Sequence, residues 1–206
     1  DDIVAREGFI KSRFKIVTLL IRLRQLCVSP ALIDNTYQEE SIKIKRLLEI
    51  IKDLVKDKHK ILIFSSFKSA IELVKEELTK ESISNYVIDG SVSGRQRVML
   101  VDAFNKDETS CFLITLKSGG VGLNLTSADV VIHLDVWWNP QAENQATDRA
   151  HRIGQTKTVT VLKLINKGTI EEKIIELQEK KKILSDSLIE GNGCLDFDTL
   201  TEEELT

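Results

Sequence analysis

The sequence contains few of the residues that interrupt or cross-link a fold. Proline occurs twice and glycine ten times in 206 residues, which leaves little room for long disordered linkers. No stretch approaches the roughly 18 consecutive apolar residues of a membrane-spanning helix, and the acidic start DDIVARE does not resemble a signal peptide. The three cysteines are too widely spaced for a CxxC metal site, and their odd number fits disulfides poorly. We therefore expect an intracellular chain with reduced thiols and no membrane partner, and its two ends suggest a fragment of a longer protein.

Motifs of a self-sufficient enzyme are missing as well. The phosphate-binding loop GxxxxGK(S/T) does not occur, and no predicted strand ends in a Walker B acidic pair. The three histidines lack the spacing of a zinc site, so no metal site is expected, and no serine or cysteine nucleophile motif is present. The net charge of −3 gives no argument for nucleic acid, so any DNA-binding surface depends on where the charges lie.

The residues that are present predict an α/β fold. A composition of 42% hydrophobic and 30% charged residues is typical of a globular protein. Short runs rich in β-branched residues predict five strands, at 60–64, 85–89, 111–115, 129–135 and 158–165. Because these runs are almost continuously apolar and helical spacing lies between them, they indicate a doubly wound, mostly parallel sheet flanked by helices.

Further helices are predicted at both ends of this core. Apolar spacing indicates one helix over 10–27 and a second beginning at Ser41. Near the far end, Thr169 precedes two glutamates, which is the pattern of a helix start, and this helix is expected to continue to about residue 188. The remaining acidic tail is expected to be poorly ordered.

Three segments that follow predicted strands are candidates for a functional site. Parallel strands end at a common edge of the sheet, where ligands of such folds bind. The segments are the glycine-rich LKSGGVGLN (116–124), VWWNPQAENQ (136–145) and QATDRAHRIGQ (145–155). Each has a structural alternative: a tight turn, two core tryptophans, and arginines paired with Glu143 and Asp148. The other interpretation is that Arg149 and Arg152, three positions apart, await a phosphate.

In combination these segments resemble the C-terminal RecA-like lobe of Swi/Snf-type DNA translocases, within the superfamily-two helicases. The resemblance covers roughly residues 14–185. KILIFSSF is similar to motif IV, ITLKSGGVGLNLTSAD to motif V, and DVWWNPQAENQATDRAHRIGQ to motif VI. LIRLRQLCVSPALI precedes the lobe, DGSVSGRQR follows motif IV, and LKLINKGTIEEKI follows the lobe as in that family. Ser66, where glutamine is common, and Leu116, where eukaryotic members often have threonine, depart from the pattern.

The resemblance implies half of an ATP-driven motor, with ATP and Mg²⁺ held mainly by a first lobe that this sequence lacks. It implies that Arg149 and Arg152 are arginine fingers. Nucleotide-binding positions would be Gln145, Gly120, Gly122 and Asn124. DNA-binding positions would be Thr115, Lys117, Ser118, Arg95, Arg97 and Trp138, with Arg95 and Arg97 alternatively holding the local fold. The implied partners are double-stranded DNA and the first lobe of the same, monomeric protein, in the cytoplasm or nucleoid of a bacterium.

The resemblance also divides the chain. Residues 1–40 would be a helical segment from between the lobes, 41–166 the RecA-like lobe, 167–190 a brace helix and 191–206 the tail. Two other functions stay open, a non-catalytic helicase-like module that binds DNA or protein, and a lobe of an RNA helicase.

Overall fold

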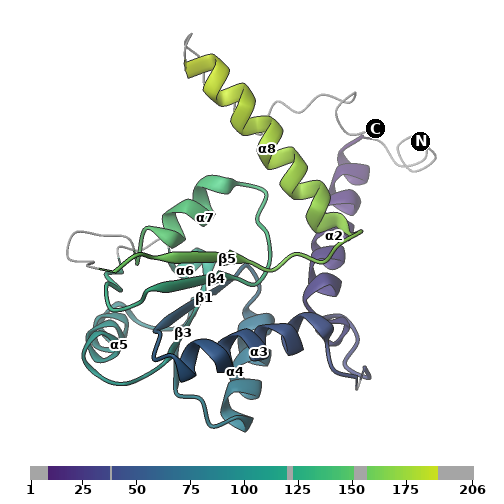
Figure 1. Cartoon of the computed structure of the whole chain (residues 1–206). Coiled ribbons are helices and arrows are strands. Elements are labelled where there is room, and N and C mark those ends of the chain that lie inside the picture. The colour runs from purple at the N-terminus through teal and green to yellow at the C-terminus, as the bar shows by residue number, and fades with distance from the viewer. Residues whose placement is uncertain (1–8, 38, 120–122, 151–156, 190–206) are drawn as a thin grey trace.

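The fold is built around one five-stranded sheet (Figure 1). The computed structural model describes residues 9–37, 39–119, 123–150 and 157–189. The strands are β1 (Ile61–Ser65), β2 (Asn85–Ile88), β3 (Cys111–Thr115), β4 (Val130–His133) and β5 (Thr160–Lys163). All five lie within one residue of the predicted runs or inside them, so the sequence pattern located the sheet correctly.

The sheet is parallel throughout, in the order β2-β3-β1-β4-β5. In the central strand β1, Phe64 is in register with Ile114 of β3 and with His133 of β4. Every residue of β1, β3 and β4 is buried, whereas most of the edge strand β5 is exposed. This burial on both faces explains why the runs are continuously apolar rather than alternating, as a parallel sheet requires.

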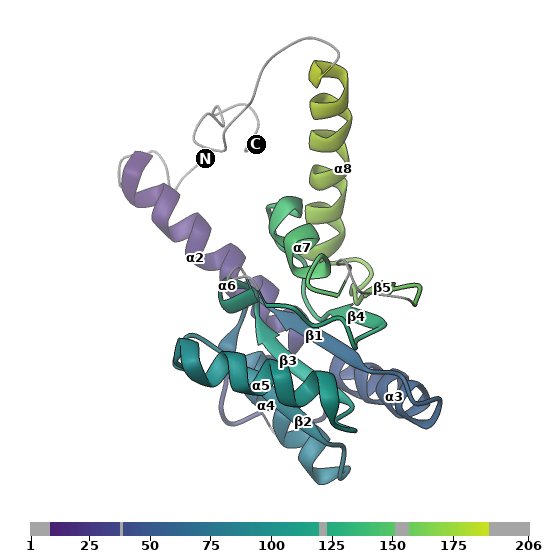
Figure 2. The ribbon, with the colours of Figure 1, turned by 90° about the vertical axis from the view of Figure 1, so that its left-hand side faces the viewer.

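Helices cover both faces of the sheet, as predicted for a doubly wound fold. They are α2 (Phe9–Val28), α3 (Ile42–Lys56), α4 (Lys68–Lys80), α5 (Gly94–Lys106), α6 (Leu116–Gly119), α7 (Pro140–Thr147) and α8 (Ile170–Ile189), with a 3₁₀ turn at Pro30–Leu32. One core cluster joins α3 and α4 to the sheet through residues such as Leu47 and Ile71. A second cluster, on the other face, joins α5 and α7 through residues such as Phe104 and Ala146 (Figure 2).

Local hydrogen bonds explain where several helices begin. Ser93 and Gln96 form a capping box at the start of α5, and Asn139 accepts a bond from the Gln141 amide before Pro140 opens α7. Thr169 Oγ1 accepts a bond from the Glu171 amide at 3.2 Å, as its position before α8 predicted. Ser41 precedes α3, but its hydroxyl instead donates to the Val28 carbonyl at 2.6 Å and so ties α3 to α2.

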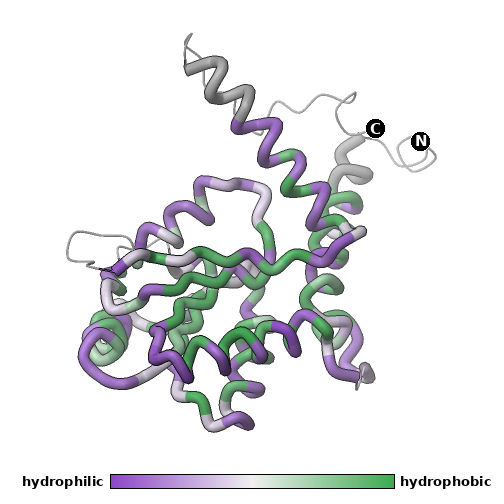
Figure 3. The backbone as a smooth tube through the Cα atoms, in the orientation of Figure 1, coloured by the Kyte–Doolittle hydropathy of each residue, from purple (hydrophilic) through white to green (hydrophobic). Residues whose placement is uncertain are grey.

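The two terminal helices, α2 and α8, extend away from the sheet and contact one another (Figures 1 and 2). Hydrophobic residues run along the central strands, whereas the coloured part of α8 is largely hydrophilic (Figure 3). On α2 the leucines at 19, 23 and 26 are exposed, while Arg24 is 1% exposed. The helical spacing of α2 therefore predicted a helix correctly, but a charged residue, together with Cys27 and Val28 at the end of the helix, faces the fold. Among the described residues no helix has the length and apolar character needed to cross a bilayer.

Candidate nucleotide and nucleic-acid site

The candidate site lies at the edge where β1, β3 and β4 end. The helix after β1, α4, packs on one face of the sheet, whereas α7, after β4, packs on the other. Neighbouring strands whose connections leave on opposite faces create a crevice at their carboxyl ends, which is where ligands of such sheets bind. Leu116 and Leu123, which follow β3, also pack on the face of α7, so the topology predicts such a position on each side of β1, one toward β4 and one toward β3.

The crevice between β1 and β4 is filled by the side chain of Arg24 from α2. One terminal nitrogen of its guanidinium, Nη2, donates to Asp135 Oδ2 at 2.7 Å, to Ser66 Oγ at 2.8 Å and to the Val136 carbonyl at 2.6 Å. Nε donates to the same carbonyl at 3.0 Å. The rings of Phe67 and Trp137 each lie about 5 Å from the guanidinium carbon, at 5.0 and 4.9 Å.

Asp135 is the counter-charge of this buried arginine. Its Oδ1 accepts bonds from Ser65 Oγ at 2.6 Å and from the Ser66 amide at 2.9 Å. Burial lowers the pKa of the Arg24 guanidinium below its ordinary value, although the neighbouring Asp135 acts in the opposite direction. The pair therefore holds the ends of β1 and β4 to α2, and it leaves this crevice closed to a ligand.

The motif V segment follows β3 on the other side of β1. Thr115 and Ser118, which were predicted to approach DNA, are both buried, and Thr115 Oγ1 donates to Ser118 Oγ at 2.9 Å. Lys117, between them on the short helix α6, is exposed. Gly120 and Gly122 lie outside the described residues. Among the described residues of this segment, Lys117 is the exposed cation, and the bond between Thr115 and Ser118 holds the turn on which it lies.

Motif V and motif VI meet beside α7. The Leu125 amide donates to the Arg149 carbonyl at 3.0 Å, so Asn124 lies next to the turn that carries Arg149. Asn124 and Gln145 are exposed, whereas Arg149 is buried. Helix α7 ends at Thr147, with Asp148 as its C-cap, so Arg149 stands in the turn after the helix. Arg152 lies outside the described residues.

Glu143 of α7 is a possible partner of the two arginines by its sequence position, but the structure gives it other partners. Its Oε1 accepts a bond from the Trp137 amide at 2.7 Å and lies 3.5 Å from Gln178 Nε2. Its Oε2 accepts a bond from Lys163 Nζ of β5. Glu143 therefore faces the interior and ties α7 to three other elements.

The remaining predicted DNA contacts lie around α5 and after β4. Arg97 donates from Nε to the Val92 carbonyl at 2.9 Å and from Nη2 to the Asp89 carbonyl at 3.1 Å, so it holds the loop before α5. In that loop the Ser91 hydroxyl and the Lys68 ammonium lower the pKa of Asp89 to about 2. Arg95 is exposed on the first turn of α5, and Trp138 is half-buried. Arg95 and Trp138 are thus accessible at this edge, and Arg97 serves the local fold.

Comparison with known proteins identifies the family of this lobe. Residues 42–154, more than half of the chain, match the helicase conserved C-terminal domain. The chain belongs to this family. Its motifs and fold are those of the C-terminal RecA-like lobe of the Swi/Snf type, as the resemblance predicted.

Relatives of the lobe come from bacteria, archaea and eukaryotes. An uncharacterized ATP-dependent helicase of Mycoplasma pneumoniae is 44% identical over 197 residues, which are 95% of this chain and 19% of the relative. The ISWI chromatin-remodeling complex ATPase of Saccharomyces cerevisiae is 34% identical over 93% of this chain and 18% of its own length. The solved Sulfolobus solfataricus SWI2/SNF2 ATPase core in complex with dsDNA is 35% identical, with a TM-score of 0.77, over 98% of this chain and 43% of that one. The chain thus spans about a fifth of the length of the two sequence relatives.

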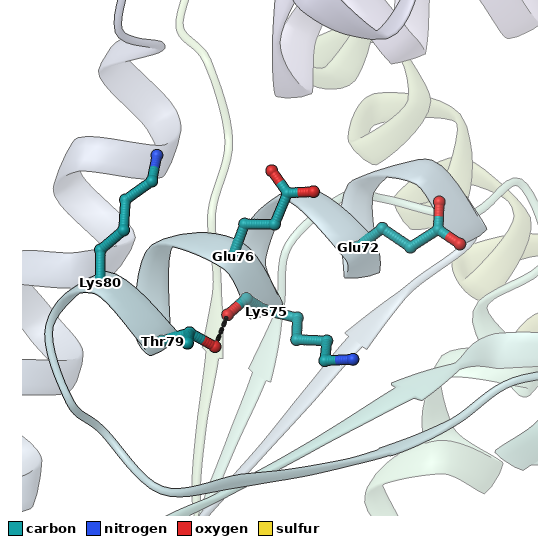
Figure 4. Close-up of a pocket in the computed structure, with 5 residues that line it drawn as sticks. All are labelled: Glu72, Lys75, Glu76, Thr79 and Lys80. Carbon is teal, nitrogen blue, oxygen red and sulfur yellow. Dashed lines mark hydrogen bonds between the residues drawn. The ribbon is translucent and has the colours of Figure 1, made fainter.

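The residues that sequence reasoning missed in this lobe are buried and polar. Arg24, Asp135 and Gln178 carry no motif signal by themselves, because their roles depend on contacts between elements far apart in the chain. A different surface feature, a hollow on the outer side of α4, has no site character (Figure 4). Its lining comes from that helix alone, and Thr79 Oγ1 simply bonds the Lys75 carbonyl one turn back at 2.7 Å.

His133, at the end of β4, gives the helicase lobe a predicted acid sensitivity. It is 1% exposed, stacks on Phe64 and lies 3.1 Å from Thr147 Oγ1 through Nε2. Burial lowers its pKa, with Glu143 and Asp135 opposing and Lys163 reinforcing that effect. Below about pH 6.5 His133 binds a proton in the unfolded chain, whereas in the folded chain its lowered pKa keeps it neutral to lower pH. Stability should be full above that pH and fall by up to about 1.4 kcal/mol per pH unit below it.

Thermal unfolding between pH 7.5 and 5 measures this slope. His133→Phe should flatten it, because phenylalanine keeps the stacking on Phe64 and does not titrate. His59→Gln is the control, since His133 is still present and the acid-dependent loss should persist. An unchanged slope in His133→Phe would assign the acid sensitivity to other groups.

Proposed function

We propose that this chain is the second motor lobe of an ATP-dependent double-stranded DNA translocase or remodeller. The observation that carries the proposal is the bond from the Leu125 amide to the Arg149 carbonyl, at 3.0 Å. It brings the exposed Asn124 and the motif VI turn together at one edge of the sheet. A nucleotide held by another lobe could be approached from this edge.

The donors at this edge suit phosphate oxygens. Amide side chains at Asn124 and Gln145 are exposed there, and the Arg149 guanidinium lies in the adjoining turn. Transfer of a phosphoryl group spreads negative charge over its oxygens, and a guanidinium placed from across a cleft stabilises that charge. Arg149 and Arg152 would supply it, and Gly120 and Gly122 would let the backbone approach the nucleotide.

The same edge is a poor source of ligands for Mg²⁺. Among its described residues, the buried carboxylates of Asp135 and Glu143 are already bound by internal donors. Mg²⁺ prefers oxygen ligands, and a bound ion would neutralise phosphate charge. In the proposed motor the metal ligands therefore come mainly from the first lobe, and this lobe contributes cations and amides.

Contacts to DNA would be made by exposed groups around the site. Lys117 and Arg95 are accessible cations on α6 and α5, and Trp138 is accessible after β4. Thr115 and Ser118, which bond each other, would support the Lys117 turn rather than reach far from it. Contacts of this kind address the phosphate backbone and carry no sequence information. The similar Sulfolobus ATPase core was solved in complex with dsDNA, and this supports duplex DNA as the partner.

ATP hydrolysis by the full-length protein tests this proposal. Duplex DNA should stimulate turnover, and DNA affinity should fall by roughly 10³-fold or more between 50 and 200 mM salt if six or more phosphates are contacted. Stronger stimulation by RNA would favour an RNA helicase lobe, and DNA binding without turnover would favour a non-catalytic module. The 206-residue chain alone is the control and should not hydrolyse ATP, because it has no Walker A motif.

A further inference from the structure

Over residues 170–182, where side chains are described, helix α8 is attached to the lobe through a narrow stripe. Glu171, Ile174 and Gln178 recur at intervals of three and four residues and are buried, with exposed fractions of 0%, 0% and 7%. Glu171 binds Lys43 of α3 at 2.6 Å and accepts a bond from the Asn166 amide at 2.9 Å. Gln178 lies two turns further along, beside α7. The stripe therefore begins at a buried ion pair and reaches the helix of motif VI.

Gln178 closes a ring of hydrogen bonds with Trp137 and Glu143. Its Nε2 donates to the Trp137 carbonyl and lies 3.5 Å from Glu143 Oε1. The Trp137 amide donates to the same Glu143 oxygen at 2.7 Å. Trp137 thus uses its backbone amide toward α7 and its backbone carbonyl toward α8, so the backbone of this one residue fixes the two helices relative to each other.

The ring is anchored on two further sides. Lys163 of β5 binds the second oxygen of Glu143, and the Trp137 ring stacks on the buried Arg24 guanidinium at 4.9 Å. Helices α2, α7 and α8 therefore all contact one residue, Trp137. Because the Glu143 and Gln178 side chains are buried, with exposed fractions of 1% and 7%, losing a partner would leave either of them poorly compensated by water.

The ring contacts the buried face of α7, opposite the face that carries the exposed residues of this helix. Glu143 and Ala146 face inward, whereas Gln145 is exposed, and Arg149 follows in the next turn. A carboxylate fixed from three elements sets the position of this short helix. A small change in how α8 lies would therefore displace the residues that α7 and its following turn present.

We propose that Gln178 is a positioning residue for motif VI. Through Glu143 and the backbone of Trp137 it holds α7 in the position from which Gln145 and the following arginines reach the nucleotide. The inference rests on the proposed function, because it assumes that these residues act on ATP. It adds that α8, outside motif VI in sequence, sets the efficiency of the catalytic step through a single amide.

Gln178→Leu in the full-length protein tests the proposal, because leucine is similar in size and cannot hydrogen-bond. We expect kcat for DNA-stimulated ATP hydrolysis to fall by about tenfold, since small misplacements of catalytic groups are costly, with KM for ATP nearly unchanged. Ile174→Val is the matched control. It loosens the same stripe without touching the ring, so it should keep kcat even where it lowers the melting temperature as much. An equal loss of kcat in the control would overturn the proposal.

Two further measurements complete the test. The double variant Glu143→Gln with Gln178→Leu should have a kcat only slightly lower than that of the more severe single variant, because both substitutions break the same ring. If the fold-losses in kcat of the two single variants instead multiply in the double variant, the two residues do not act through one ring. If Arg152→Ala keeps normal turnover, the proposed function fails. If Arg152→Ala loses turnover while Gln178→Leu keeps it, only the positioning role fails.

Discussion

Arg152→Ala in the full-length protein should lower DNA-stimulated ATP turnover by on the order of 10³-fold. The transferred phosphoryl group carries its charge on three oxygens in a loose transition state, and an arginine reaching in from a second lobe is matched to them. Alanine leaves that charge without a preorganised donor. Binding of ATP should change much less, because the interaction is strongest in the transition state. Steady-state hydrolysis at saturating duplex DNA measures both effects.

Two variants show whether the rate depends on the guanidinium of Arg152 or only on its positive charge. Arg152→Lys keeps a cation but loses the planar fork that matches phosphate oxygens, so it should recover only a small part of the rate. Lys167→Ala removes an exposed cation in the turn before α8 and should leave turnover unchanged. Near-normal hydrolysis by Arg152→Ala would show that motif VI does not supply an arginine finger in this protein.

The sheet was predictable because its physics is local. Strands such as Cys111–Thr115 are buried on both faces, so the required pattern is a short, continuous apolar run that needs no knowledge of partners. The start of α7 also has a local cause, since Pro140 suits a first helical position and the Asn139 side chain accepts a bond from the Gln141 amide. The location of the candidate site was predictable as well, because parallel strands end at one edge of the sheet and the motif segments follow those strands.

The interior polar contacts of the site were not predictable in this way. The residues around Glu143 do not show whether its carboxylate pairs with a cation nearby in the sequence or, as here, binds Lys163 of β5. Arg24 lies in a helix whose leucines suggest an apolar buried face, yet those leucines are exposed. Only the tertiary fold brings α2 to the ends of β1 and β4, 111 residues away for the pair of Arg24 and Asp135. Sequence motifs thus located the exposed chemistry, and the structure was needed to find what positions it.

The second large effect is expected from Arg24→Met, which should destabilise the fold by about 3–5 kcal/mol. Methionine fills much of the space between Phe67 and Trp137 but leaves the Asp135 carboxylate, whose side chain is 0% exposed, without its counter-charge. Breaking one half of a buried pair costs this much because the remaining charge stays desolvated. For a chain of this size the melting temperature should fall by roughly 6–20 °C. Urea and thermal unfolding followed by circular dichroism give the two numbers.

The partner variants decide whether the charge of Asp135 is the cause. Arg24→Met combined with Asp135→Asn removes both charges, and the neutral amide can still accept bonds from Ser65 and Ser66, so most of the lost stability should return. Arg22→Met, at an exposed position of the same helix, should change stability by no more than about 0.5 kcal/mol. If the double variant is as unstable as Arg24→Met alone, the loss comes from the stacking and packing of the guanidinium. The ends of β1 and β4 would then be held to α2 by the two aromatic rings more than by the ion pair.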